Sequence, residues 1–167
     1  MKLFKLLSLL VILSIVSCNT NKKNKQLTQL SNEEHLENEG LKLLKQHCYA
    51  CHSVISPSHD AIIAPPMVAV KRRYKMSYKN ESDFVNAFTN WILDPKEEKA
   101  LMRGAVMNFN VMPKQPFEKN DIVKIATYVY NNELEKPQWF DKHFTEEHPN
   151  GMGNGLGKGR GRIRNSN

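Results

Sequence analysis

Two cysteines and a histidine stand close together in the segment QHCYACHSV, residues 46–54. Cys48 and Cys51 are three positions apart, and His52 directly follows the second cysteine. Four kinds of site share this spacing: a covalent haem attachment, half of a zinc site, a dithiol redox centre, or two buried thiols that are close by chance. The elements that position the three residues help to decide among these alternatives.

The residues before and after the motif predict different structures. Leu36, Leu43 and Leu44 lie at helical intervals, so a first helix is predicted to run into the cysteine pair. Residues 53–80 contain three prolines and little periodicity, which predicts a long and mostly irregular loop. A loop of that length is uncommon unless it covers something.

Two further helices are predicted later in the chain. The segment NESDFVNAFTNWILDP predicts a helix that begins at Asn80 or Ser82 and ends before Pro95. The segment EKNDIVKIATYVYNNEL predicts the last helix of the domain, with acidic Glu118 and Asp121 at its start, where they suit the helix dipole. Residues 96–115 predict a short helix at most, and no strand alternation of useful length occurs.

The absence of strands bears on the four alternatives. A dithiol oxidoreductase places its pair at the start of a helix after a strand, whereas this pair follows a helix. Zinc needs two more ligands, and the only later pair at a ligand-like separation is His143 and His148, more than ninety residues beyond Cys51. A disulfide across two residues closes almost no loop and would stabilise little. Covalent haem remains, because each thiol can add to one haem vinyl group while the adjacent histidine binds the iron.

Residues 36–134 resemble a class I cytochrome c. The first helix of that family carries a glycine, a large apolar residue and the first haem cysteine at steps of four, and Gly40, Leu44 and Cys48 match that spacing. Its last helix crosses the first at the glycine with an aromatic residue, and Tyr128 occupies that position. The resemblance implies an all-α cytochrome c fold, with three to five helices around one covalently attached haem c.

The resemblance also implies the ligands of the haem iron. His52 would be one axial ligand, and Met112 in VMPKQPF, sixty residues further on, would be the other. The carbonyl of a proline orients the histidine ring in this family, and Pro65 is preferred here over its neighbour Pro66. Met107 is a rival for Met112. The Ser or Thr that caps the family's last helix is replaced by Glu118.

The two ends of the chain differ from the central domain. The stretch MKLFKLLSLLVILSIVSC has the layout of an export signal, and SIVSC resembles a bacterial lipoprotein signal in which Cys18 is lipidated. The alternative is ordinary cleavage near Ser17, with Cys18 as a stray thiol. The expected organisation is a signal peptide over 1–17, a flexible tether over 18–35, a cytochrome c domain over 36–136, and a C-terminal extension over 137–167. The extension is Gly-rich and is expected to be disordered.

The formal charge of +7 is spread over the whole chain. Residues 35–136 carry fourteen basic and twelve acidic groups, a net charge of +2, so nucleic acid is excluded as a partner. The densest basic cluster of the domain is KRRYKMSYK, residues 71–79. It has two interpretations of equal weight: a docking patch for redox partners, or a solvated loop that also meets a haem propionate.

These expectations together describe an electron carrier rather than an enzyme. It would be exported to the periplasmic side of a bacterial membrane, held there by a lipid on Cys18, and would exchange electrons with redox protein partners. One alternative is a haem subunit or accessory protein of a fixed membrane or periplasmic oxidoreductase complex. A further alternative is a haem-based sensor in which Met112 is displaced by a small molecule.

Overall fold

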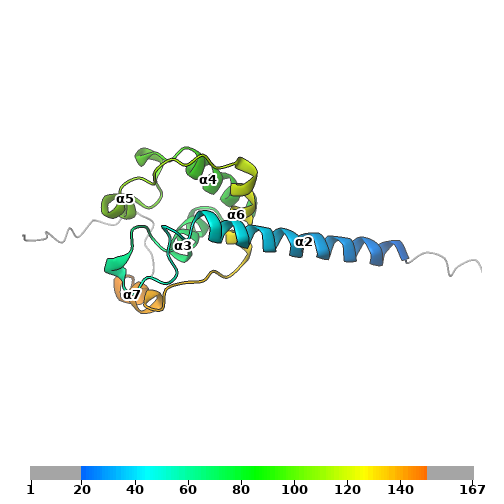
Figure 1. Cartoon of the computed structure of the whole chain (residues 1–167), viewed down its shortest axis with the longest axis horizontal. Helices are drawn as coiled ribbons and strands as arrows, with labels where there is room; N and C mark the ends of the chain where they lie inside the picture. Colours follow the sequence, from blue (N-terminus) through cyan, green and yellow to red (C-terminus); the bar gives the residue numbers. More distant parts are fainter. Residues whose placement is uncertain (1–19, 150–167) are drawn as a thin grey trace, which may run out of the picture. The chain divides into compact units, whose positions relative to one another are not determined.

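The computed structural model describes residues 20–149, with side-chain surroundings from residue 34 onward. The predicted signal peptide, Cys18 and residues 150–167 lie outside the described residues. The described chain is all-α, as predicted, and contains no strand. Its α-helices are α2 (Thr20–His47), α3 (Met67–Ser77), α4 (Glu81–Leu93), α5 (Arg103–Phe109), α6 (Lys119–Asn131) and α7 (Phe140–Glu147), with short 3-10 helices at His59–Ala61 and Glu97–Lys99 (Figure 1).

The helices with the clearest local signals are confirmed. Helix α4 has Asn80 as its N-cap, where the side-chain oxygen accepts a hydrogen bond from the backbone N–H of Asp83 at 2.9 Å, and it ends just before Pro95. Helix α6 follows Glu118, which occupies the N-cap position without a capping side-chain bond. The short helix expected between residues 96 and 115 is α5. Capping and proline signals thus mark α4, whereas α6 is marked by its apolar face and its acidic first turn.

The predicted irregular loop over 53–80 is wrong in its second half, where helix α3 forms. Pro66 is the N-cap of this helix with extended backbone, so the two prolines lie just before its first turn and interrupt nothing. Met67 and Tyr74 are buried and Val70 packs against the same core. This apolar stripe at helical spacing was present in the sequence but was outweighed by the prolines.

Helix α2 begins much earlier than its apolar pattern predicts. Residues 20–35, expected to form a flexible tether, are helical. They contain neither proline nor glycine and are rich in Lys, Gln, Leu and Glu, which are good helix formers. Among the described residues, no helix is long and apolar enough to cross a bilayer. That this segment connects a lipid anchor at Cys18 to the domain stays a prediction.

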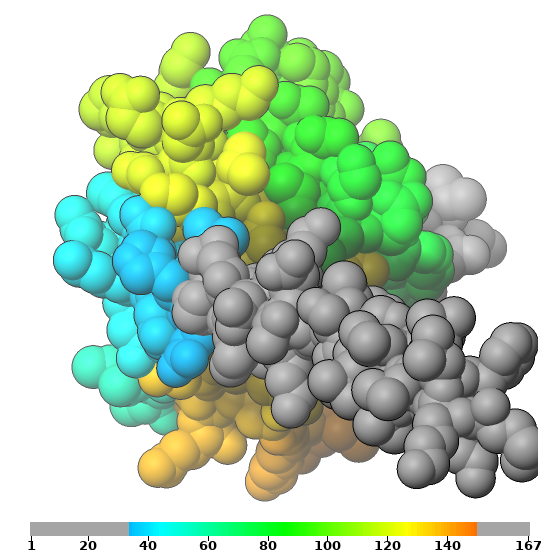
Figure 2. Space-filling model, turned by 90° about the vertical axis from the view of Figure 1, so that its right-hand side faces the viewer, coloured from blue at the N-terminus to red at the C-terminus, as the bar shows by residue number. Residues whose placement is uncertain are grey.

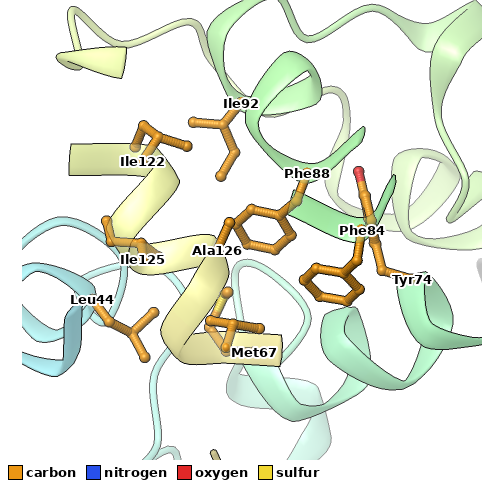
Figure 3. Packing of buried hydrophobic residues seen from close by; sticks show 10 residues of the cluster. Leu44, Met67, Tyr74, Phe84, Phe88, Ile92, Ile122, Ile125 and Ala126 are labelled. Atoms are coloured by element: carbon orange, nitrogen blue, oxygen red, sulfur yellow. The ribbon is translucent and has the colours of Figure 1, made fainter. Parts of the chain in front are cut away.

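The core of the domain lies between α4 and α6, which contact each other more extensively than any other two described helices. Figure 3 shows how α4 supplies Phe84, Phe88 and Ile92 while α6 supplies Ile122, Ile125 and Ala126. Tyr74 from α3 packs edge-on against both phenylalanine rings, with centroids 5.8 and 5.4 Å away. Leu44 of α2 is completely buried in the same cluster. The cluster thus joins the end of α2 to the other helices of the domain.

Helices α2 and α6 touch at Gly40. A methyl group on Gly40 would lie 2.7 Å from Tyr128 Cβ and 2.8 Å from the Lys124 carbonyl oxygen. A salt bridge of 2.7 Å between Lys124 and Glu39 accompanies this contact. In Figure 2 the yellow residues, which include the beginning of α6, lie against both the blue residues before the cysteine pair and the green α4. Only glycine allows the two backbones to come so close.

Replacing Gly40 by alanine is expected to lower the free energy of unfolding by about 3 kcal/mol, because the added carbon meets a backbone carbonyl that cannot move aside easily. The measurement is denaturant unfolding of the purified full-length protein. Gly104→Ala is the matched control: Gly104 lies in exposed α5 with nothing within 4 Å of the added carbon, so stability should stay equal or rise by up to about 1 kcal/mol. Equal losses in the two variants would contradict a close crossing at Gly40.

The predicted disorder of the C-terminal extension is wrong for residues 137–149. Pro137 and Phe140 are buried, and helix α7 packs onto the domain. The burial of apolar surface on Trp139, Phe140 and Phe144 offsets the conformational entropy that this segment loses when it becomes ordered. With α7, the described residues contain six α-helices, whereas three to five were predicted. The additional helix is α7, which lies beyond residue 136.

Candidate functional site

The cysteine motif forms a tight turn at the end of α2. The helix ends at His47, and the N–H of Cys48 still donates to the Leu44 carbonyl at 2.9 Å. The Cys48 carbonyl then accepts two hydrogen bonds, from the N–H of Cys51 at 3.2 Å and of His52 at 2.8 Å. The turn therefore gathers both thiols and the imidazole within one short stretch of backbone, positioned by the buried Leu44 one turn earlier.

Both thiols are free and differ in exposure. Cys48 is half-buried against the core cluster, while Cys51 is exposed. Burial, followed by the influence of Cys51, raises the pKa of Cys48 to about 12. A dithiol redox centre works through a thiolate whose pKa is lowered, so the surroundings of Cys48 disfavour that chemistry.

His52 is held by a carbonyl across a loop. Its Nδ1 lies 2.6 Å from the Pro65 carbonyl oxygen. Burial lowers the pKa of His52, and the hydrogen bond to Pro65 opposes this in part. The ring is consequently neutral near pH 7, with its proton on Nδ1 facing the carbonyl and the lone pair of Nε2 available to a metal. Of the two adjacent prolines, Pro65 is the one whose carbonyl makes this contact.

Met112 lies in the loop between α5 and α6. It is half-buried and packs against the same cluster as Cys48, so one buried core supports both. Two residues before it, Asn110 ends α5 with φ 65° and ψ 178°, a conformation found almost only in glycine. Met107, the rival ligand, has 85% of its surface exposed and lies on the outer side of α5. No contact among the described residues joins Met112 directly to His52.

The donor set fits a haem better than a bare metal ion. Among residues 34–149, no group of three or more His, Cys, Asp or Glu side chains could hold a metal ion. A haem iron takes four ligands from the porphyrin and needs only one or two from the protein. Two free thiols at the required spacing and a neutral imidazole with one nitrogen already bonded meet that need.

Three other polar or aromatic residues near the motif and the core pack within the domain. His47 packs edge-on against Phe117, with ring centroids 5.3 Å apart. Trp91 is half-buried and lines a hollow of about 230 Å³ between α3, α4 and the segment after the second 3-10 helix, together with Tyr74, Tyr78 and Leu101. The hydroxyl of Tyr49, between the two cysteines, is buried without a hydrogen-bond partner among the described residues.

The basic cluster over residues 71–79 is largely engaged inside the domain. Lys71 donates to the Asn132 carbonyl, and Arg73 Nε donates to the Leu101 carbonyl at 3.0 Å. Lys75 lies over the ring of Tyr130 at 4.0 Å. These cations hold α3 against its neighbours. The solvated loop of the second interpretation is wrong for residues 71–77, which are helical, and a basic groove of about 500 Å³ lies beside α3.

The structure also brings together residues that the sequence analysis did not connect with the motif. Trp139 Nε1 donates to the Ser56 carbonyl at 2.9 Å, and His143 stacks on His59 with centroids 4.0 Å apart. Their partners lie about eighty residues earlier, and no local pattern in one sequence shows such a pairing.

The comparisons with known proteins provide one distant relative. No protein-family model matches the chain, and no solved structure matches it. A protein of Aquifex aeolicus (strain VF5), described as an uncharacterized protein, is 28% identical over an alignment of 117 residues, which covers 60% of this chain and 77% of the relative. The functional conclusion therefore depends on the site itself.

Proposed function

We propose that this protein is a single-haem c-type cytochrome that transfers electrons at a membrane surface in the bacterial cell envelope. The observation that supports the proposal most is the 2.6 Å contact between His52 Nδ1 and the Pro65 carbonyl, made by the histidine directly behind two free thiols. Such a contact orients an imidazole and raises its basicity as a metal ligand. The close approach of two helices at Gly40 supports it independently.

Each side chain would have a defined part in holding the haem. Cys48 and Cys51 would each form a bond from sulfur to one carbon of a vinyl group, and the thiol proton would pass to the other carbon. His52 would bind the iron through Nε2, and Met112 would supply the other protein ligand. A bound haem would supply one iron that alternates between ferrous and ferric forms, carrying one electron at a time.

The choice of ligands favours electron transfer over other haem chemistry. A thioether sulfur stabilises ferrous iron, so ligation by His52 and Met112 would hold the reduction potential high. Two protein ligands leave no open position for a substrate. Donor and acceptor would be other redox proteins, and the lipid expected on Cys18 would keep the domain at the membrane surface.

The test is to express the full-length protein in a bacterial host that attaches haem to exported proteins. The expected result is an intact mass increased by one haem, a pyridine haemochrome spectrum typical of two thioether bonds, and a reversible one-electron titration. An established monohaem cytochrome expressed in parallel shows that attachment works. A protein without haem from cells that load this reference would overturn the proposal.

A further inference from the structure

The loop over residues 53–64 joins His52 to the carbonyl that its ring contacts. Hydrogen bonds within the loop span three residues or fewer. Two of its large apolar side chains are largely exposed, Ile55 at 88% and Ile63 at 67%, and no residue of the loop belongs to the buried cluster. Few interactions within the loop therefore stabilise its conformation, yet the contact between His52 and Pro65 depends on that conformation.

Helix α7 and the residue before it supply the missing support. The hydrogen bond from Trp139 Nε1 to the Ser56 carbonyl is the only one that joins the loop to another part of the described chain. The indole ring also meets His59 edge-on at 5.7 Å, and His143 stacks on that histidine at 4.0 Å and meets the indole edge-on at 5.7 Å. In Figure 1, α7 lies beside this loop.

Helix α7 is itself fixed to α3. Arg72 lies over the rings of Phe140 and Phe144 at 5.0 and 4.4 Å, and its guanidinium is 3.6 Å from the carboxylate of Asp141. Phe140 is only 3% exposed. Because α3 begins directly after Pro65 and Pro66, α7 bridges the middle of the loop and the helix at its far end.

We propose that α7 is a strap that fixes loop 53–64, and that Trp139 is a positioning residue which maintains the hydrogen bond between His52 and Pro65. This inference depends on the proposed haem function only for its effect on the iron; its effect on the loop is independent of haem. By keeping the carbonyl at hydrogen-bond distance from Nδ1, the strap holds the basicity of the axial imidazole constant.

The first measurement is amide hydrogen exchange in the full-length protein. Trp139→Phe keeps an aromatic ring but removes the N–H donor, and exchange at Ala61 and Ile62 is expected to accelerate roughly fivefold, as the loss of one hydrogen bond of about 1 kcal/mol implies. Lys142→Ala, on an exposed position of the same helix, should leave these rates unchanged. Unchanged rates in Trp139→Phe would overturn the strap.

The second measurement separates positioning from simple support. In the ferrous haem protein, Trp139→Phe is expected to shift the NMR resonance of the His52 Nδ1 proton and the midpoint potential, whereas Lys142→Ala should shift neither. If the loop exchanges faster but both signals stay in place, α7 supports the loop without positioning His52, and that part of the inference is wrong. If no haem is attached, the proposed function is wrong, but the hydrogen-exchange experiment still tests whether α7 fixes the loop.

The stacked histidines add a dependence on pH. Burial, and then His59, lower the pKa of His143, with His148 acting in the same direction and Glu146 and Glu147 opposing it. On the loop, His59 faces the carboxylate of Asp60 at 3.5 Å. The pKa of His143 is lowered while α7 is packed on the loop, and a free histidine has a pKa of about 6.5. Neutral His143 therefore stabilises the packed arrangement fully above about pH 6.5. This stabilisation is lost as the pH falls and the imidazole takes up a proton.

The protection of the loop amides against hydrogen exchange should therefore be constant above about pH 6.5 and decrease below it. The decrease is expected to reach up to about tenfold for each unit by which the pKa of His143 is lowered. Exchange rates between pH 7 and pH 5, corrected for intrinsic chemistry, give this dependence directly. His143→Gln cannot acquire a proton and should show much weaker dependence. The same decrease in both proteins would show that the histidine pair does not control the strap.

Discussion

A protein in which both Cys48 and Cys51 are replaced by alanine is expected to carry no covalently bound haem. Each thioether requires one of the two sulfur atoms, and none of the other described residues offers a thiol. The intact mass should equal that of the polypeptide, and acid acetone should extract any haem that remains. The loss should be complete rather than partial. Each single variant should retain one thioether at most, which changes the pyridine haemochrome band.

Tyr49→Phe is the matched control for this experiment. It alters the residue between the cysteines but keeps their spacing, and it removes only a buried hydroxyl that has no partner among the described residues. The control should load haem normally, and its stability should not fall, because an unpaired buried polar group is removed. Covalent haem in the double variant would mean that the attachment residues are assigned wrongly.

The second large effect is expected from Met112→Ala. Loss of the thioether sulfur should abolish the charge-transfer band between methionine and ferric iron, and should allow the ferrous protein to bind carbon monoxide. Axial ligands vary haem potentials over about 0.8 V, so a decrease on the order of 0.1 V is expected. Absorption spectra and a potentiometric titration of the same preparation measure all three changes.

Met107→Ala distinguishes the loss of a ligand from the loss of any methionine in this region. Met107 is 85% exposed on α5, whereas Met112 packs against the core. The Met107 variant should keep the band, the potential and the resistance to carbon monoxide. If it loses the band while Met112→Ala keeps it, Met107 is the ligand. A wild-type protein that lacks the band and binds carbon monoxide readily would favour a sensor instead.

Much of the helical framework could be predicted because its signals are local. The Asn80 cap of α4, the stop before Pro95 and the acidic start of α6 each depend on neighbouring residues. The early start of α2 was missed because the apolar pattern was taken as the limit of the helix, although residues 20–35 contain no helix breaker. Helix α3 was missed because prolines that precede a helix were interpreted as breaks in one.

The spacing of Cys48, Cys51 and His52 was sufficient to nominate the chemistry, since a haem with two vinyl groups demands that pattern. Gly40 and Tyr128 were likewise nominated from spacing, and the tertiary structure showed that the two helices approach closely there. The sequence by itself thus determined α4, α6 and the candidate donors, because helix signals and motif spacing both act over a few residues.

Only the tertiary structure decided which groups surround those donors. It placed His52 against the carbonyl of Pro65, the proline that the resemblance had already favoured, and Trp139 against Ser56, contacts that join residues 13 and 83 positions apart. It also showed that Arg72 holds α7 rather than facing a partner freely. Such contacts depend on how the helices pack as a whole, and that packing is a property of the complete core rather than of any short segment.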